Sequence, residues 1–296
     1  MMHSRMTGSE ELRAAAERLH HAKRVLVLTG AGISAESGIT PFRSEGGLWE
    51  RYPPKRYATW SGLLGALLLQ PRHLVRFASE VLGPIARARP NPAHLAIAEL
   101  ERRVHLTVVT QNVDGLHQEA GSTGVRQIHG SMFEIADRHG RILRRLSRAD
   151  MGDIARKLGL AAQGPLALAR ASLALRPLAG MSSGGPYLPN IVLFGDKLRQ
   201  PDWDDAQRCA DQCDLVVIVG TSGMVMPAAA LPDQARSHGA NVIVVDPTPQ
   251  SRADVHLRGR AAELMPALVA LAADFRASLA PDPERPPPGA RAARIP

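Results

Sequence analysis

Three short groups of small or polar residues, each directly after an apolar run, have the residue types needed at a nucleotide site. The groups are Gly30, Ala31 and Gly32; Gln111, Asn112 and Asp114; and Gly220, Thr221 and Ser222. In the first group the side chains are so small that a phosphate can approach backbone N–H groups. In the second group, amide and carboxylate side chains follow a strand and are expected to point from its end into a crevice.

The apolar runs before these groups predict strands that are buried on both faces. Such runs cover residues 24–30, 105–112, 214–222 and 241–248, with a weaker one at 190–195. Helical patterns, for example at 93–103 and 226–239, alternate with them. This alternation predicts an α/β fold with a Rossmann-like, doubly wound parallel sheet. Because ligands bind beyond the carboxyl ends of such strands, the three groups should converge on one nucleotide crevice.

The first group departs from the dinucleotide fingerprint of dehydrogenases. The pattern GxGxxG needs a third glycine where Ala35 stands, and no acidic residue follows a second strand about twenty residues further on. A dehydrogenase is therefore disfavoured, although a nucleotide site is still expected.

Two segments interrupt the alternation and predict a smaller, mostly helical second lobe. They cover about residues 45–92 and 131–189, whereas about 10–44, 93–130 and 190–272 form the large nucleotide-binding part. Within the first segment, the leucine-rich run at 63–70 is interpreted as a helix core. We expect one catalytic domain over 1–279 and a disordered, proline-rich tail over 280–296.

The bulk composition fits a cytoplasmic globular protein. The 296 residues are 45% hydrophobic and carry a net charge of +8, but the basic residues are spread along the chain and only 4% are aromatic, so nucleic acid is not an expected partner. The two cysteines, Cys209 and Cys213, cannot form a disulfide framework. No apolar run reaches membrane-spanning length, and no membrane partner is expected. The oligomeric state cannot be predicted.

Seven motifs that occur in order resemble those of the sirtuin family of NAD-dependent protein deacylases over about residues 10–272. They are GAGISAESGITPFR (30–43), GLW (47–49), PNPAH (90–94), TQNVDGLHQEAG (110–121), HG (129–130), NIVLFGD (190–196) and VGTSGMVMPAA (219–229). The resemblance implies an enzyme that removes an acyl group from lysine, transfers it to ADP-ribose and releases nicotinamide, with NAD as cofactor and an acyl-lysine protein or peptide as substrate.

The resemblance also implies which residues bind NAD. They are Gly30, Ala31, Gly32, Ile33, Ser34, Phe42, Arg43, Gln111, Asn112, Asp114, Gly220, Thr221, Ser222, Val225, Asp246 and Ala261. In similar proteins Phe42 would shield the reactive ribose carbon and Arg43 would contact phosphate. Asp114 and the Ile33 backbone would hold the nicotinamide carboxamide, although Asp114 could instead cap the next helix. Residues 220–222, Val225, Asp246 and Ala261 would take the adenosine side.

By the same resemblance, His129 is the general base and Asn112 the second catalytic residue, which with Gln111 orients the ribose and a water. A base with a pKa near the working pH suits removal of a ribose proton, and histidine has such a pKa. The acylated lysine would be held by Ile191, Val192, Phe194 and Gly195. The Tyr-x-x-Arg pair of relatives that prefer acidic acyl groups is missing over 73–84, so acetyl or longer apolar acyl groups are expected. As the alternative to a helix core, the leucines of 63–70 would widen the acyl-lysine tunnel for a fatty chain.

The chain departs from the family in the segment that usually binds zinc. Most sirtuins carry four cysteines there, but residues 131–189 contain none, and His139 is the segment's one histidine. Since a tetrahedral site of nitrogen and sulfur ligands cannot be built from these residues, no metal is expected and apolar packing should hold the lobe. The substrate strand also differs, with Asp196 where glutamate is usual.

Two alternatives stay open from the sequence. The same fold could serve an ADP-ribosyltransferase or NAD glycohydrolase, which would use the nicotinamide pocket with another nucleophile or with water. It could also be an inactive module that senses NAD and acts through a partner. The presence of Gln111, Asn112, Asp114 and His129 speaks against the inactive module.

Overall fold

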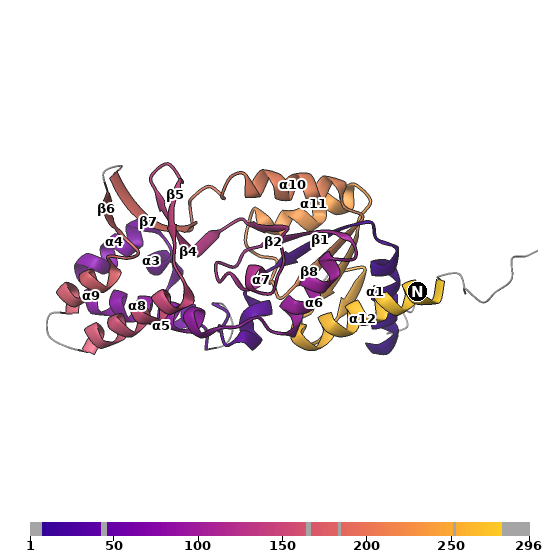
Figure 1. The fold of residues 1–296 in the computed structure, drawn as a ribbon, viewed down its shortest axis with the longest axis horizontal. Coiled ribbons are helices and arrows are strands. Elements are labelled where there is room, and N and C mark those ends of the chain that lie inside the picture. The colour runs from indigo at the N-terminus through magenta and orange to yellow at the C-terminus, as the bar shows by residue number, and fades with distance from the viewer. Residues whose placement is uncertain (1–7, 43–45, 164–166, 183–184, 251–252, 280–296) are drawn as a thin grey trace, which may run out of the picture.

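A computed structural model describes residues 8–42, 46–163, 167–182, 185–250 and 253–279. Two lobes lie side by side along the long axis of the molecule (Figure 1). Arg43 and the tail 280–296, for which the sequence makes predictions, lie outside the described residues.

The larger lobe is built on a six-stranded sheet with the order β10-β9-β8-β1-β2-β3. All of its strand pairs are parallel. The strands are β1 (Arg24–Thr29), β2 (His105–Thr110), β3 (Val125–Gln127), β8 (Leu215–Val219), β9 (Asn241–Val245) and β10 (Val255–Leu257). In β1 every residue after Arg24 is buried, as a central strand covered on both faces requires. The predicted α/β class with a Rossmann-like parallel sheet is confirmed.

Helices cover both faces of this sheet. One face packs against α1 (Gly8–His21), α6 (Pro92–Glu101) and α12 (Ala261–Leu279), and the other against α10 (Asp202–Gln212) and α11 (Leu231–Ser237). Figure 1 shows the two layers on opposite sides of the strands. Three short helical turns complete the lobe: η1 (Ala31–Ser37), α7 (Leu116–Glu119) and η2 (Ala228–Ala230).

Strand β1 lies where the direction of the chain's winding reverses. It pairs with β2 on one side and with β8 on the other, so successive connections leave it in opposite directions. The carboxyl ends of strands at such a switch point border an open crevice. The three groups predicted from the sequence follow β1, β2 and β8, so all three stand at this crevice.

The smaller lobe combines helices with an antiparallel sheet that the sequence analysis does not predict. Its sheet has the order β5-β4-β7-β6. The strands are β4 (Gly130–Asp137), β5 (Ile142–Arg145), β6 (Gly180–Ser182) and β7 (Gly185–Ile191). The helices are α2 (Leu48–Arg51), α3 (Pro54–Tyr57), α4 (Trp60–Leu69), α5 (Pro71–Arg87), α8 (Arg148–Gln163) and α9 (Ala167–Leu175).

The weaker predicted strand at 190–195 is wrong in its extent and its sheet. Only Asn190 and Ile191 are in a strand, the end of β7, which pairs antiparallel with β4 in the smaller lobe. The chain from Val192 onward leaves the sheet and runs along the opening between the lobes. No helix of the described ranges is long and apolar enough to cross a membrane.

Candidate active site

A single cavity of about 1550 Å³ joins the two lobes and contains nearly all of the predicted site residues. Its volume exceeds the range of about 300–1,000 Å³ that is usual for a small-molecule site. The predicted residues in its wall are Gly30, Ala31, Gly32, Ser34, Phe42, Gln111, Asn112, Asp114, His129, Ile191, Val192, Phe194, Gly195, Gly220, Thr221, Ser222, Val225, Asp246 and Ala261. Ile33 is fully buried behind this wall.

The glycines at the ends of β1 and β8 are required because the two turns pack against each other. A Cβ atom at Gly32 would lie 2.7 Å from the Gly220 backbone, and one at Gly220 would lie 2.2 Å from the nitrogen of Ile33. The Gly32 N–H donates to the Gly220 carbonyl (2.8 Å), and the Ile33 N–H donates to the Gly30 carbonyl (3.2 Å). The expectation that the amides of the first group face an anion is therefore wrong for Gly32, and also for Gly30, whose N–H donates to the Val219 carbonyl (3.2 Å).

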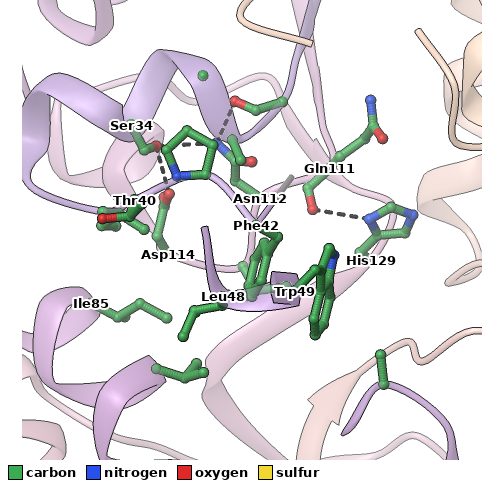
Figure 2. A pocket seen from close by; sticks show the side chains of 18 of the residues that line it. Ser34, Thr40, Phe42, Leu48, Trp49, Ile85, Gln111, Asn112, Asp114 and His129 are labelled. Carbon is green, nitrogen blue, oxygen red and sulfur yellow. Dashed lines mark hydrogen bonds between the residues drawn. The ribbon is translucent and has the colours of Figure 1, made fainter. Parts of the chain in front are cut away.

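A hydrogen-bonded polar network lies at one end of the cavity (Figure 2). The Ser34 hydroxyl donates to Asp114 Oδ2 (2.7 Å), and Asn112 Nδ2 donates to Ser34 Oγ (3.1 Å) and to the Gly30 carbonyl (3.0 Å). These bonds connect the turn after β1 to the turn after β2. Phe42, Leu48, Trp49 and Ile85 stand around them, so polar groups meet an apolar wall.

Asp114 is 5% exposed, and both of its carboxylate oxygens have partners. Oδ1 accepts from the Leu116 N–H (3.0 Å) at the start of α7, while Oδ2 accepts from Ser34. Asp114 lies one position before Gly115, the N-cap residue of α7, so this bond forms a turn ahead of the helix rather than a cap, and the side chain stays in the cavity wall. Burial raises the pKa of Asp114 above its usual value, against the lowering effect of these hydrogen bonds.

His129 is held in one tautomer by its neighbour. Its Nδ1 lies 3.0 Å from the Gln111 carbonyl oxygen, which can only accept, so Nδ1 carries the proton. In the neutral ring Nε2 then has a free lone pair. Burial lowers the pKa of His129, and the bond to Gln111 offsets part of this effect. The ring is therefore neutral near pH 7 and can accept a proton.

Gly130 explains why a glycine follows the histidine. Its φ is +77°, and a Cβ atom there would lie 1.9 Å from the Asn190 carbonyl oxygen, so β4 and β7 can meet only if the residue is glycine. Directly beside it, the Val192 N–H donates to the His129 carbonyl (3.0 Å), and the Phe194 N–H donates to the Ala58 carbonyl (2.8 Å). The segment 192–194 thereby lies along the cavity wall between the two lobes.

The other end of the cavity is formed by the ends of β8 and β9. Gln111 Nε2 donates to Thr221 Oγ1 (3.1 Å), which connects this end to the turn after β2. The Asp246 carboxylate accepts from the Thr248 N–H (2.8 Å) and is 8% exposed. Near Ala261, the side chain of Glu36 accepts from the Ala262 N–H (2.9 Å), so η1 is also fastened to the start of α12.

Two residues that hold the site in place were not predicted from the sequence. Asn91 caps α6 through the Ala93 N–H (3.0 Å), and its Nδ2 donates to the Ile33 carbonyl (2.7 Å) and to Ser37 Oγ (3.0 Å). The Asn-Pro pair before a helical pattern predicts the cap but not the contacts with η1. Arg148 of α8 donates to the Asp114 carbonyl (3.0 Å), to the Ile85 carbonyl and to Glu119, so it joins the lobes below the polar network.

Comparison with known proteins gives the chain a family. The Sir2 family profile matches residues 30–227. An "NAD-dependent protein deacylase" of Ralstonia nicotianae is 40% identical over 253 residues, which are 84% of this chain and 92% of that protein. An "NAD-dependent protein deacylase 2" of Archaeoglobus fulgidus is 39% identical and aligned over 88% of this chain and 95% of that protein.

Solved structures agree. A Sir2 homologue in complex with NAD has a TM-score of 0.71 and 30% identity, covering 93% of this chain and 97% of that one. A Sir2 protein bound to a myristoylated histone peptide has a TM-score of 0.66 and 31% identity, covering 91% of this chain and 99% of that one. The chain belongs to the Sir2 family.

Proposed function

We propose that this protein is an NAD-dependent protein lysine deacylase, with NAD and the acylated lysine bound together in the cavity between the lobes. The observation that supports this proposal most directly is the state of His129. This histidine is neutral, lies in the cavity wall, and donates its Nδ1–H to the Gln111 carbonyl. A base with this arrangement removes a proton through Nε2. The comparisons support the activity, because the matched relatives are named NAD-dependent protein deacylases.

The cavity fits NAD in size and in its distribution of polar groups. The polar network of Ser34, Asn112 and Asp114 suits the nicotinamide carboxamide, and the stacked rings of Phe42 and Trp49, with centroids 4.8 Å apart, offer an aromatic wall beside it. We assign the nicotinamide half to Ser34, Phe42, Gln111, Asn112 and Asp114. When bound, NAD supplies the electrophilic ribose carbon and the hydroxyls that take up the acyl group.

The rest of the dinucleotide is assigned to the turns after β1, β8 and β9. The contacts proposed there are Gly30, Ala31, Gly32, Gly220, Thr221, Ser222, Val225, Asp246 and Ala261. Ile33 is assigned to the nicotinamide half through its backbone, but its carbonyl already accepts from Asn91 and its N–H is bonded to Gly30. A contact between Ile33 and NAD must therefore share or replace these bonds. Arg43 is still predicted to contact phosphate.

The acylated lysine is assigned to the wall formed by Ile191, Val192, Phe194 and Gly195. This segment follows β7 directly and is fastened to His129 at one side and to Ala58 at the other. An extended peptide can add to such a segment by backbone pairing, and the lysine side chain can then enter the cavity. The apolar side chains favour acetyl or longer apolar acyl groups over charged ones.

The smaller lobe is proposed to fold without zinc. Among the described residues, no group of three or more histidine, cysteine, aspartate or glutamate side chains could hold a metal. Packing of α5 against α8 instead supplies a core that includes Val75, Leu82, Met151, Ile154 and Leu158. Elemental analysis of purified protein should find no stoichiometric zinc, and strong chelators should leave its thermal midpoint unchanged. One zinc per chain would refute this.

A cytoplasmic location is proposed from the cysteines. Both are free, and burial raises the pKa of Cys213 to about 12, which makes its thiol unreactive. A protein with unpaired cysteines suits a reducing compartment. Cell fractionation with markers for cytoplasm, membrane and exported proteins tests this location.

The proposed activity is tested by measuring nicotinamide release from NAD with and without an acetyl-lysine peptide, with mass spectrometry of the products. Peptide-dependent release, with the acyl group on ADP-ribose, supports the deacylase. His129→Ala should abolish it, whereas His139→Ala, an exposed histidine on the β4–β5 hairpin, should not. Release without peptide, yielding free ADP-ribose or ADP-ribosylated protein, would instead identify a glycohydrolase or transferase. No release at all would indicate an NAD-sensing module.

A further inference from the structure

Helix α4 exposes its large apolar side chains to solvent. Trp60, Leu64, Leu67 and Leu68 are 45%, 59%, 46% and 73% exposed, and Leu69 at the end of the helix is 81% exposed. The first four follow the spacing i, i+4, i+7 and i+8, which places them on one side of a helix. We call this side the α4 face. The interpretation of residues 63–70 as a helix core is therefore wrong.

Two small residues of α4, Gly62 and Ala66, point inward and fix its orientation. Ala66 is 1% exposed, and a Cβ atom at Gly62 would lie 2.4 Å from the Lys55 carbonyl oxygen, so α3 touches the backbone of α4 at this glycine. Thr59 caps the helix through the Gly62 N–H (3.1 Å), and Trp60 Nε1 donates to Asp196 Oδ2 (2.9 Å). The helix cannot rotate to bury its leucines without breaking these contacts, so an exposed apolar side is a built-in property of the lobe.

Exposed basic residues lie in the helices directly before and after α4 in the chain. Lys55 and Arg56 of α3 are exposed, and Arg56 Nη1 donates to Gln70 Oε1 (3.0 Å), which places it beside the C-terminal end of α4. Arg72 and Arg76, one turn apart at the start of α5, are exposed as well. None of these four makes an ion pair with a described acidic residue. Glu80 is paired with Arg51, and Asp196, which accepts from the neutral indole of Trp60, is one exposed carboxylate against four basic side chains.

We propose that the α4 face docks on an anionic membrane surface. Leucine and tryptophan side chains enter the boundary between headgroups and acyl chains, and the flanking lysine and arginines pair with anionic headgroups. Unpaired basic charge around the patch favours a lipid surface over a second copy of this chain, which would bring the same basic charge to the contact. The expectation of no membrane partner is thereby revised, for a contact that lies on the bilayer without crossing it.

The docked face adjoins the proposed substrate opening. Phe194 is fastened to Ala58 at the α3–α4 corner, and Leu63 of α4 lines the cavity itself. Docking would therefore bring the opening of the cavity close to the lipid. The docking itself does not depend on deacylase activity, so it can be tested separately from the proposed function.

The test is co-sedimentation of the full chain with vesicles of phosphatidylcholine alone and of an equal mixture with phosphatidylglycerol. We expect binding to the mixed vesicles that weakens with added salt, and little binding to phosphatidylcholine. The double variant Leu64→Glu/Leu68→Glu should need at least about tenfold more lipid for half binding. Arg56→Gln and Arg72→Gln should each cost about fivefold.

The matched control is Leu95→Glu on α6, where the leucine is 53% exposed in the other lobe; it should bind mixed vesicles like the wild type. Equal thermal midpoints of all variants would show that they are folded. The proposal is overturned if mixed vesicles do not sediment the wild type, or if the double variant binds as well as the wild type. It is also overturned if size-exclusion chromatography shows that the wild type is a dimer and the double variant a monomer, while neither protein binds vesicles.

Discussion

Replacement of Asn91 by alanine should weaken both the fold and the binding of NAD, because one side chain caps α6 and holds the turn after β1. The substitution removes the cap, which is worth about 1 kcal/mol. It also removes two hydrogen bonds to η1, at about 1 kcal/mol each. We therefore expect the free energy of unfolding to fall by about 3 kcal/mol and the thermal midpoint to fall by about 6 °C or more.

Asn91→Ser separates the two roles of this residue. Serine is also a good N-cap, but its shorter side chain cannot reproduce the amide contacts with the Ile33 carbonyl and Ser37. Asn91→Ser should therefore keep the part of the free energy of unfolding that comes from the cap. Both variants should raise the KM for NAD by about tenfold, because the turn must then be ordered at the expense of binding.

The assay combines thermal unfolding, followed by circular dichroism, with the NAD dependence of nicotinamide release. A fall in midpoint of less than about 2 °C for Asn91→Ala would refute the stability argument. An unchanged KM for NAD in both variants would refute the claim that Asn91 holds the turn in its binding conformation. Recovery of KM but not of stability by serine would reverse the assignment of the two roles.

Three further predictions follow from the histidines and the glycines. Because burial lowers the pKa of His129, kcat/KM should stay level as pH falls from 8 to the usual histidine value near 6.5 and decline only below it; a decline centred above 7 would contradict this. The pKa values of His94 and His117 are lowered by burial to about 4 and about 3. Below pH 6.5 the unfolded chain therefore takes up protons that the folded chain does not, and stability should fall by about 1.4 kcal/mol per histidine and pH unit down to these values. Urea unfolding at pH 7 and pH 5 measures this, and His94→Gln should remove about half of the difference. Finally, Gly130→Ala should cost about 3 kcal/mol or more, whereas Gly140→Ala, with nearly the same positive φ but open space, should cost about 1–2 kcal/mol; equal midpoints for the two would rule out the clash with Asn190.

The central sheet was predictable because its strands are buried on both faces. Their sequences are therefore mostly apolar, and short apolar runs of this kind are typical of strands covered on both faces. This holds for β1, β2, β8 and β9. β3 and β10 have three residues each, too few to show a period. The antiparallel sheet is hidden for other reasons: β5 carries two arginines in four residues, and β7 contains Pro186 and Pro189.

The candidate site was predictable as a set of residues but not as a set of contacts. The three groups converge because parallel strands end at the same edge of a sheet. The hydrogen bond between Asn91 and the Ile33 carbonyl could not be predicted, because the two residues are 58 positions apart and the local sequence around each gives no sign of the other. For the same reason Gly30 and Gly32 suggested room for a phosphate, whereas the structure shows that they make room for the turn at Gly220 and Thr221.

The central place of β1 has a consequence for how the protein is made. Its neighbour β2 is synthesised soon after it, but its other neighbour, β8, begins only at Leu215. Until then a nascent chain presents the apolar edge of β1 without a partner, an arrangement prone to pairing with other chains. Folding of the large lobe must therefore wait for the last third of the chain. Assistance by a chaperone during translation should raise the yield of native protein more than assistance afterwards.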